Sequence, residues 1–350
     1  MGLTDLGGWG GVLVGLTAGN HLSAAQAEEV LDEVLAGTAT DAQIAALLIA
    51  LKMKGETPEE VDGLVAAMLK HSTPVVAPQG AVDIVGTGGD RSGSVNVSTM
   101  ASFVVAGAGA PVVKHGNRAI SSSVGAADVL EGLGVVIELG PAGVEACLAE
   151  AGMGFCFAQR YHPAMRFVGP VRRELATPTI FNILGPLANP ARPTRQLVGV
   201  ADPARARMVA DVLGRRGTVR ATVVYGDDGM DEVTLTAPST LLEVHGDGTS
   251  ATVTEHRLDP RDFGLSLVEP SALVGGSLEV NVRAVHEVLS GAKGPHRDIV
   301  LLNAAVALVD AGVAIDVHQG LEIGATSIDS GSAARVLERL VATSTAFGRS

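Results

Sequence analysis

The sequence predicts an α/β protein in which a small all-helical domain precedes a larger α/β domain with a central, mostly parallel sheet. Residues 22–70 have helical apolar spacing, and residues 72–80 contain two prolines and no periodicity. Beyond residue 80, short apolar strands alternate with loops and helices. This alternation is typical of a parallel sheet, because each helical crossover returns the chain to the edge where the next strand starts.

Three helices are expected within residues 22–70, because three sets of helix start signals occur there. Each set includes a side chain that can accept a hydrogen bond from the free N–H groups of a first helical turn. The signals are Ser23 with Gln26, then Asp41 before AQIAALLIALKMKG, and finally Thr57 with Pro58 and Glu60. We expect the boundary between the domains near residue 75, within the segment STPVVAPQG.

The α/β domain should contain at least four strands and three helices. Strands are expected where short apolar runs are bounded by turn residues, and helices where apolar residues recur with helical spacing. The expected strands are residues 81–85, 111–113, 196–200 and 221–225, and the expected helices are residues 97–108, 126–133 and 296–313.

The charge balance excludes two classes of partner. The 350 residues include 25 Lys and Arg against 38 Asp and Glu, a formal net charge of −13. An acidic chain repels nucleic acid and anionic lipid unless it has a separate basic stripe, and the sequence has no run of lysine and arginine. We therefore expect neither nucleic-acid nor membrane partners.

The expected compartment is the cytoplasm. Residues 1–9 have no positive residue ahead of a glycine-broken apolar stretch, and the uncharged span 92–113 contains too many polar groups for hydrocarbon. Neither a signal peptide nor a transmembrane helix is therefore expected. Cys147 and Cys156 fit no disulfide framework or metal-ligand spacing, so we expect two small buried side chains in a reducing compartment.

The first candidate site is the glycine loop after the strand expected at 81–85. Gly86–Asp90 has the sequence GTGGD. It lacks the lysine of a Walker A loop, and Arg91 stands where GxGxxG needs its third glycine. Alone, such a loop is most often a plain tight turn. Polar side chains follow it at the start of an apolar helix and favour an anion site: Ser92, Ser94, Asn96, Ser98 and Thr99.

The second candidate is the cationic loop KHGNR, Lys114–Arg118, which continues into Ser121, Ser122 and Ser123. Loops at the carboxyl ends of parallel strands gather on one edge of a sheet, so this loop should face GTGGD. Alone, KHGNR would fit a solvated turn equally well. Two such loops in consecutive strand-helix units favour a ligand with several phosphates.

The third candidate is the acidic segment DDGMDE, Asp227–Glu232, after the strand expected at 221–225. In a turn, Asp231 and Glu232 can converge on a hard cation, which favours Mg²⁺ shared with substrate phosphates. The alternative is an acidic loop that is merely exposed to solvent.

The fourth candidate is the segment YHPAMRFVGPVRREL, residues 161–175. Arg172 and Arg173 can bind a carboxylate through paired hydrogen bonds or can be surface arginines. His162 can be either a packed histidine or a ligand contact. The residues alone do not decide between these interpretations.

Six motifs occur in one order along the chain, and together they are far more specific than any one of them. They are GTGGD, NVST at 96–99, KHGNR, the single segment from YHP to VRREL at 161–175, FNILGPLANPA at 181–191 and GMDEV at 229–233. In this order and spacing, the chain resembles the anthranilate phosphoribosyltransferase family over almost its whole length.

The resemblance implies a nucleoside-phosphorylase-like phosphoribosyltransferase fold. Residues 160–186 would then join residues 1–75 as a discontinuous helical domain, with the α/β domain formed by residues 76–159 and 187–350. The implied reaction transfers a phosphoribosyl group from phosphoribosyl pyrophosphate to the amino group of anthranilate, in tryptophan biosynthesis. The implied assembly is a homodimer joined through the helical domain.

The resemblance also implies which residues bind each ligand. Two Mg²⁺ ions per subunit would be held by Ser98, Asp231 and Glu232. Phosphoribosyl pyrophosphate would be held by Gly86, Gly89, Asp90, Ser94, Asn96, Val97, Ser98, Thr99, Lys114, His115, Gly116, Asn117, Arg118, Ser121 and Ser122. Anthranilate would be contacted by Gly86, His115, Asn117, His162 and Arg172. The residues central to catalysis would be Lys114, Asn117, Asp231 and Glu232.

The chain departs from the family pattern in three places. Ser123 and Val124 stand where a Lys-Ser-Gly element often begins, Arg91 replaces a frequent glycine, and Phe167 stands where His or Asn is common. These departures concern pyrophosphate affinity more than reaction type. Two alternatives remain: a pyrimidine nucleoside phosphorylase of the same fold, which needs phosphate and no metal, or a non-catalytic relative that binds ligands without turnover.

Overall fold

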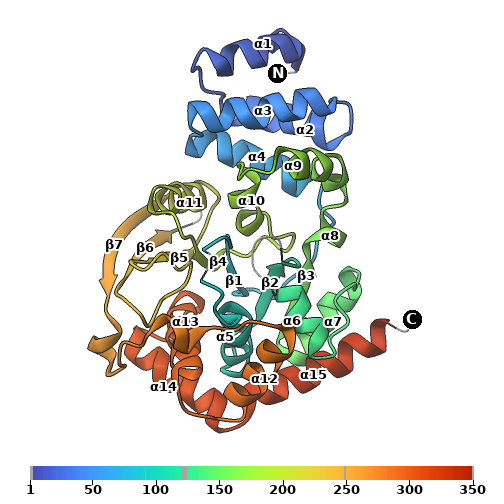
Figure 1. Ribbon diagram of the computed structural model, residues 1–350. Helices are drawn as coiled ribbons and strands as arrows, with labels where there is room; N and C mark the ends of the chain where they lie inside the picture. The colour runs from blue at the N-terminus through green and yellow to red at the C-terminus, as the bar shows by residue number, and fades with distance from the viewer. Residues whose placement is uncertain (1–2, 91, 120–123, 248–249, 349–350) are drawn as a thin grey trace. The chain divides into compact units, whose positions relative to one another are not determined.

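The computed structural model describes residues 3–90, 92–119, 124–247 and 250–348. The chain divides into two compact units, each described separately below. One is all helical and consists of Met1–Pro74 with Gln159–Pro190. The other is an α/β unit that consists of Val75–Ala158 with Ala191–Ser350 (Figure 1). The first division thus falls beside residue 75, and the inserted helical segment is slightly longer than the expected residues 160–186.

The helical unit is built from short helices with strong N-caps. Its elements are η1 (Leu3–Leu6), α1 (Gly8–Thr17), α2 (Ala24–Leu35), α3 (Asp41–Lys54), α4 (Pro58–Lys70), α8 (Ala158–Tyr161), η2 (Pro163–Phe167), α9 (Gly169–Leu175) and α10 (Phe181–Leu187). Ser23 and Thr57 form the expected capping boxes. The expectation for α3 is wrong by one residue. Thr40 is the cap, because its extended backbone lets its hydroxyl accept a bond from the Gln43 amide, and Asp41 is the first helical residue.

A buried ion pair joins these helices. Glu60 in α4 accepts hydrogen bonds from Lys54 Nζ at 2.8 Å and from the Leu22 amide at 2.9 Å. Both charged side chains are almost wholly buried. The start of α2 lies close to α4, since a Cβ on Gly63 would come within 2.0 Å of the Ala24 carbonyl oxygen.

The α/β unit contains one seven-stranded sheet in the order β3-β2-β1-β4-β5-β6-β7. Its strands are β1 (Val82–Gly86), β2 (Val112–Gly116), β3 (Met153–Phe157), β4 (Arg195–Gly199), β5 (Arg220–Gly226), β6 (Ser239–Gly246) and β7 (Ala251–Leu258). Neighbouring strands from β3 to β5 are parallel, while β6 and β7 add an antiparallel edge. The predicted fold class is confirmed, although β3, β6 and β7 were not among the expected strands.

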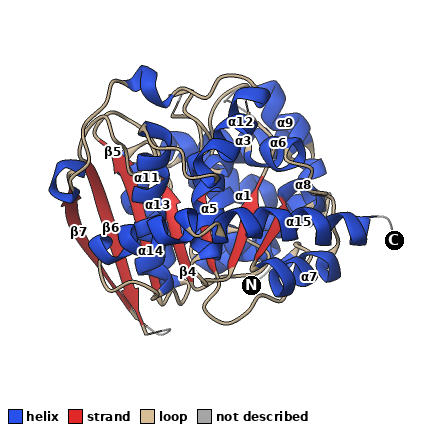
Figure 2. Ribbon diagram, turned by 90° about the horizontal axis from the view of Figure 1, so that it is seen from below, coloured by secondary structure: helices blue, strands red, loops and turns tan. Residues whose placement is uncertain are grey.

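Helices cover both faces of this sheet. They are α5 (Val97–Gly107), α6 (Ala126–Gly132), α7 (Pro141–Ala151), α11 (Pro203–Arg215), α12 (Leu278–Leu289), α13 (Pro295–Ala311), α14 (Val317–Asp329) and α15 (Ser332–Gly348), with the short turns η3 (Pro260–Phe263) and η4 (Pro270–Leu273). Figure 2 shows α13, α5 and α15 in a row across the sheet. On β5, Thr222 bonds to Asp310 of α13. Helix α11 packs on the opposite face, where Gly214 lies beside Val244.

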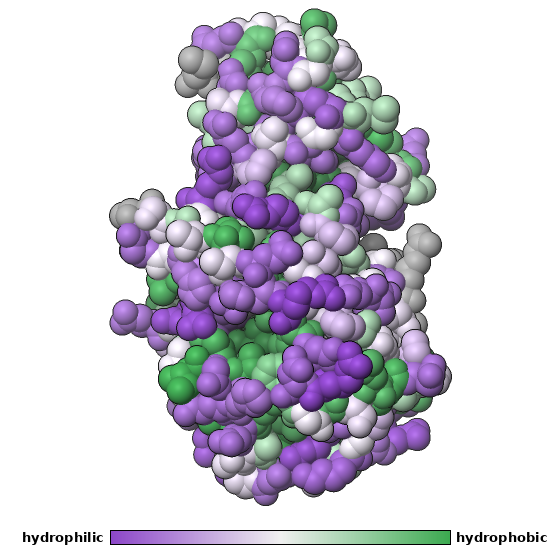
Figure 3. Space-filling model, turned by 90° about the vertical axis from the view of Figure 1, so that its left-hand side faces the viewer, coloured by the Kyte–Doolittle hydropathy of each residue, from purple (hydrophilic) through white to green (hydrophobic). Residues whose placement is uncertain are grey.

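No helix in the described part of the chain is both long and apolar enough to cross a bilayer. On the face drawn in Figure 3, hydrophilic residues surround the apolar ones. Cys147 and Cys156 are buried and unpaired, as the sequence predicts.

Candidate functional site

Asp231 lies over the carboxyl ends of two neighbouring strands. Strands β1 and β4 end in register at Gly86 and Gly199. A Cβ on Gly199 would lie 1.6 Å from the Asp231 backbone oxygen, and one on Gly86 would lie 2.6 Å from Asp231 Oδ2. The same Oδ2 accepts a 2.7 Å hydrogen bond from the Gly88 amide. Glycine at both strand ends is therefore what lets the acidic turn reach the GTGGD loop.

Three carboxyl groups gather at this point. Burial, followed by the charge of Asp90, raises the pKa of Asp231 to about 7. Burial and then the charge of Asp231 raise the pKa of Glu232 well above its ordinary value, although Lys114 and the Ser98 amide oppose this shift. Crowded, desolvated carboxyls of this kind are typical of functional sites, because each negative charge disfavours the next.

Lys114 supplies the positive charge beside these carboxyls. Its side chain is 1% exposed, and its Nζ donates to Ser98 Oγ at 3.1 Å and to the Ile84 carbonyl oxygen. Burial lowers its pKa, while the charges of Asp83 and Glu232 oppose that effect. The sequence placed Lys114 in a loop, but it lies inside β2, where it is enclosed rather than solvated.

The polar segment after GTGGD is held in place by the distant segment 273–281. The Val95 amide donates to the Leu273 carbonyl oxygen at 2.9 Å, and the Asn96 amide donates to Asn281 Oδ1 at 3.0 Å. Asn96 is also the N-cap of α5, because its side chain accepts a bond from the Thr99 amide. Ser98 and Thr99 thus lie in the first turn of a helix whose N-terminus is fixed beside Lys114 and Glu232.

His115 and Arg118 of the KHGNR motif bond to acidic side chains of the α/β unit. The His115 amide donates to Asp83 Oδ1 at 3.1 Å. Arg118 pairs with Asp128 and Glu131 at 3.0 and 2.8 Å, and these carboxylates raise its pKa. Its guanidinium is therefore committed to helix α6, and a phosphate would compete with two carboxylates for it. Ser121 and Ser122, together with Arg91 and Ser123, lie outside the described residues.

Two further candidates lie in the helical unit. His162 is buried next to the backbone of Met68 and Ala188, and burial lowers its pKa to about 4. Its imidazole is therefore neutral near pH 7. This burial is what a packed histidine predicts. A neutral imidazole is also suited to contact an aromatic ligand.

Arg172 in α9 is the better candidate for a carboxylate contact. Its guanidinium lies 5.3 Å from the centre of the Phe181 ring, and burial lowers its pKa. Within the described residues, no carboxylate forms an ion pair with it. Arg173 is exposed. The two adjacent arginines, which the motif alone left equivalent, thus differ in burial.

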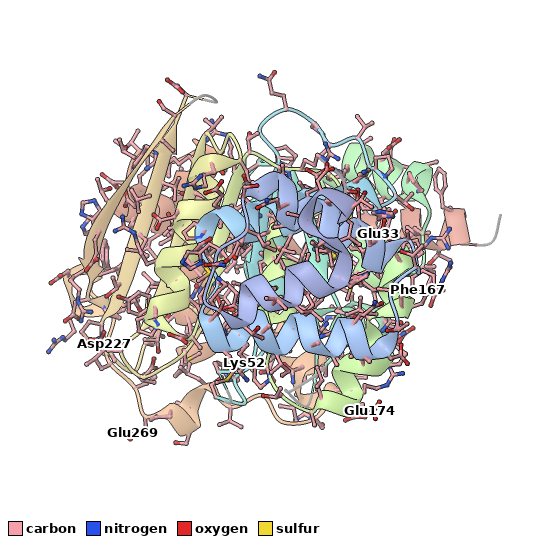
Figure 4. The ribbon with its side chains drawn as sticks, turned by 90° about the horizontal axis from the view of Figure 1, so that it is seen from above. Glu33, Lys52, Phe167, Glu174, Asp227 and Glu269 are labelled. Carbon is pink, nitrogen blue, oxygen red and sulfur yellow. The ribbon has the colours of Figure 1, made fainter. Side chains whose placement is uncertain are left out.

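Phe167 has a packing role. A Cβ on Gly37 would lie 2.6 Å from the ring of Phe167, and Arg166 places its guanidinium 4.6 Å from the ring centre. Figure 4 labels Phe167 on the helical unit together with Glu33, Lys52 and Glu174. The departure at Phe167 therefore fills a space beside α2.

Sequence reasoning did not identify two contributors to the site. Gly199 closes a predicted strand, and a glycine directly after an apolar strand was the available signal. Asp83 is a fully buried carboxylate inside β1, and a charged residue within an apolar strand run was the signal there.

Two family models match this chain. The "Glycosyl transferase family, a/b domain" matches residues 78–334, and the "Glycosyl transferase family, helical bundle domain" matches residues 12–72. Anthranilate phosphoribosyltransferase of Saccharopolyspora erythraea is 51% identical over 99% of both chains. The enzyme of Thermomicrobium roseum is 51% identical over 97% of both chains.

Solved structures show the same likeness. Anthranilate phosphoribosyltransferase of Thermus thermophilus is 39% identical, with a TM-score of 0.89 over 95% of this chain and 99% of that one. The Saccharomyces cerevisiae enzyme in complex with PRPP and Mg is 28% identical, with a TM-score of 0.85 over 96% of this chain and 98% of that one. The relatives named here are all anthranilate phosphoribosyltransferases. They therefore support that interpretation over a nucleoside phosphorylase or a non-catalytic relative. The chain belongs to the anthranilate phosphoribosyltransferase family of glycosyl transferases.

Proposed function

We propose that this chain transfers the phosphoribosyl group of 5-phosphoribosyl 1-pyrophosphate to the amino group of anthranilate and releases pyrophosphate, as a step of tryptophan biosynthesis. The observation that carries the proposal is the convergence of Asp231, Glu232, Lys114 and Ser98 at the carboxyl end of one sheet. Cationic, hydroxyl and carboxylate groups together suit a metal-bound diphosphate.

The carboxylates fit Mg²⁺. Asp231 and Glu232 offer hard oxygen donors, and their raised pKa values reflect a site where a divalent cation would relieve repulsion. The described residues contain no group of three acidic, histidine or cysteine side chains suited to a metal by itself. Substrate oxygens would thus complete the coordination shell of Mg²⁺. We propose two ions per subunit, held by Ser98, Asp231 and Glu232. When bound, Mg²⁺ would stabilise negative charge on a departing pyrophosphate.

The protein's own groups bind and orient the substrates. The reaction displaces pyrophosphate from the anomeric carbon of the sugar, and negative charge grows on the leaving group. The buried ammonium of Lys114 and the N-terminus of α5 would oppose that charge in a site from which water is excluded. The family resemblance further supports contacts to phosphoribosyl pyrophosphate from the GTGGD, NVST and KHGNR residues named above.

Anthranilate needs orientation more than activation. Its aromatic amine is nucleophilic in the neutral form, so no strong base is required. We propose that Arg172 binds the carboxylate of anthranilate and that Asn117 lies near its amine, with His115 and the neutral His162 beside the ring. The Saccharomyces cerevisiae relative has been solved with 4-fluoroanthranilate, which supports an aromatic acid as the acceptor.

We also propose a cytoplasmic homodimer joined through the helical domain. Exposed apolar side chains on α1 and α3 support this assembly, with Val14 70% exposed and Met53 80% exposed. A dimer contact would remove such surface from water. Light scattering on the purified protein gives the mass of the assembly, and a monomer at all concentrations would contradict the proposal.

The decisive experiment compares two reactions on the same preparation. Anthranilate, phosphoribosyl pyrophosphate and Mg²⁺ should give phosphoribosyl anthranilate and pyrophosphate, detected by loss of anthranilate fluorescence and by phosphate analysis after pyrophosphatase treatment. Thymidine with inorganic phosphate should give no thymine. Thymine release without anthranilate consumption would overturn the proposal in favour of a nucleoside phosphorylase. Ligand binding without any product would favour a non-catalytic relative.

A further inference from the structure

The ladder between strands β1 and β2 is interrupted just before the loops that they carry. Strand β1 pairs along its whole length with β4, and β2 pairs along its whole length with β3. Between β1 and β2, however, the register within residues 82–86 and 112–116 contains the single pair Val82 and Val112. The sheet is therefore regular on both sides of this junction and interrupted at the junction itself.

The interruption has a defined cause. The Val82 amide donates to the Pro111 carbonyl oxygen, and a parallel ladder continued from that bond would pair the His115 amide with the Ile84 carbonyl oxygen. Both groups have side-chain partners instead. The His115 amide donates to Asp83 Oδ1 at 3.1 Å, and the Ile84 oxygen accepts from Lys114 Nζ.

Two charged side chains thus replace one rung of the ladder. Asp83 has no exposed surface and Lys114 is 1% exposed, so both charges are taken out of water. Burying such a pair gains little stability compared with apolar residues in a regular ladder. The regular hydrogen bonding of the sheet is interrupted where β2 continues into KHGNR. Such departures from local structural rules are expected at functional sites.

These side-chain hydrogen bonds determine where the Lys114 ammonium lies. With its Nζ on the Ile84 carbonyl oxygen, the same ammonium reaches Ser98 Oγ at 3.1 Å. In a regular ladder, Lys114 would have to share the Ile84 oxygen with the His115 amide, which would change the direction from which its ammonium approaches. Asp83 therefore influences Lys114 through the His115 amide that it binds.

We propose that Asp83 is a positioning residue for phosphoribosyl transfer, whose carboxylate diverts the His115 amide from the ladder and so holds Lys114 and the KHGNR loop in place for the pyrophosphate. This inference rests on the proposed function, since it assumes that Lys114 faces the leaving group. It predicts a larger effect on phosphoribosyl pyrophosphate than on anthranilate, because His115 and Asn117 of the same loop are also proposed to contact anthranilate.

The test uses Asp83→Asn and Asp83→Ala, with Asp310→Asn as the matched control. Asp310 is a buried carboxylate of the same unit, bonded to Thr222 at 2.9 Å, and it has no part in the proposed site. Steady-state kinetics would give both KM values for each variant. Calorimetry with phosphoribosyl pyrophosphate would give binding without turnover, and thermal melting would report folding.

Asp83→Asn keeps an acceptor oxygen for the His115 amide but removes the charge beside Lys114. We expect the KM for phosphoribosyl pyrophosphate to rise about tenfold, with a smaller rise in the KM for anthranilate, because His115 and Asn117 of the same loop are proposed to contact that substrate. Asp83→Ala should show a larger rise, which the Asn variant partly rescues. Asp310→Asn should leave both KM values unchanged.

The inference is overturned if Asp83→Asn binds phosphoribosyl pyrophosphate as tightly as the original protein, or if kcat falls with both KM values unchanged, as a purely structural role predicts. If Asp83→Ala does not fold, the Asn variant alone decides. If the unsubstituted protein binds phosphoribosyl pyrophosphate but makes no product, the proposed function is wrong. The calorimetric comparison of the variants still tests the role of Asp83.

Discussion

Replacing Arg172 with alanine should raise the KM for anthranilate far more than the KM for phosphoribosyl pyrophosphate. Arg172 is partly buried, and no carboxylate pairs with it within the described residues. Its guanidinium has already lost part of its hydration, so a carboxylate ligand gains more from it than from a solvated arginine.

The magnitude follows from the contacts that are lost. A hydrogen bond to a charged group contributes about 1.5–3 kcal/mol, so losing the Arg172 fork should cost roughly 2–3 kcal/mol of anthranilate binding. At about 1.4 kcal/mol for each factor of ten, the KM should rise about 30-fold to 150-fold. The stacking contact with Phe181 at 5.3 Å contributes about 0.5–1 kcal/mol, so the protein itself should remain folded.

The assay is steady-state consumption of anthranilate at saturating phosphoribosyl pyrophosphate and Mg²⁺. Arg173→Ala is the matched control, because Arg173 is the next residue of α9 but is exposed. Arg172→Lys keeps the charge and removes the planar fork, so it should fall between the original protein and the alanine variant. An unchanged KM for anthranilate in Arg172→Ala, or an equal rise in Arg173→Ala, would refute the assignment.

Three other substitutions test the site and the helical unit. Asp231→Asn combined with Glu232→Gln should abolish turnover at every Mg²⁺ concentration, and recovery of activity at high Mg²⁺ would contradict the metal assignment. Gly199→Ala should lower kcat/KM at least about 100-fold with a cooperative melt retained, because its Cβ would lie 1.6 Å from the Asp231 backbone oxygen; normal kinetics would exclude the close approach. Burial raises the pKa of Glu60, but hydrogen bonds from Lys54 and backbone amides outweigh burial and leave that pKa below its ordinary 4.5. Its stabilising contribution is therefore complete above about pH 4.5 and is lost as the pH falls through the lower folded value, so acid melts of Glu60→Gln should lose less stability than those of the original protein.

The helical elements were predictable because their signals are local. The capping boxes at Ser23 and Thr57 involve residues three positions apart, and both form as predicted. Strands β6 and β7 escaped prediction because their residues include Glu243, His245 and His256 among the apolar ones. An antiparallel edge of this kind carries polar side chains on one face, so its apolar signal is weaker than that of a buried strand.

The site itself was predictable only in part, because the missing information is non-local. The glycine loops, the lysine and the acidic pair each have a sequence signature, and the structure brings them together. The commitment of Arg118 to Asp128 and Glu131 has no such signature, since a cation in a loop motif does not reveal its partner. For the same reason, the residue types alone did not distinguish Arg172 from Arg173; the family resemblance favoured Arg172, and the two side chains differ in burial.

Charged residues inside buried parallel strands are the most informative anomalies in this chain. Periodicity treats Lys114 as the end of a strand, yet the strand continues through it to Gly116. A lysine or aspartate there has to be paired, and the pairing displaces main-chain hydrogen bonds that would otherwise form. Asp83 and Lys114 do this together at one rung of the ladder. The sheet is therefore least regular where β1 and β2 continue into their loops.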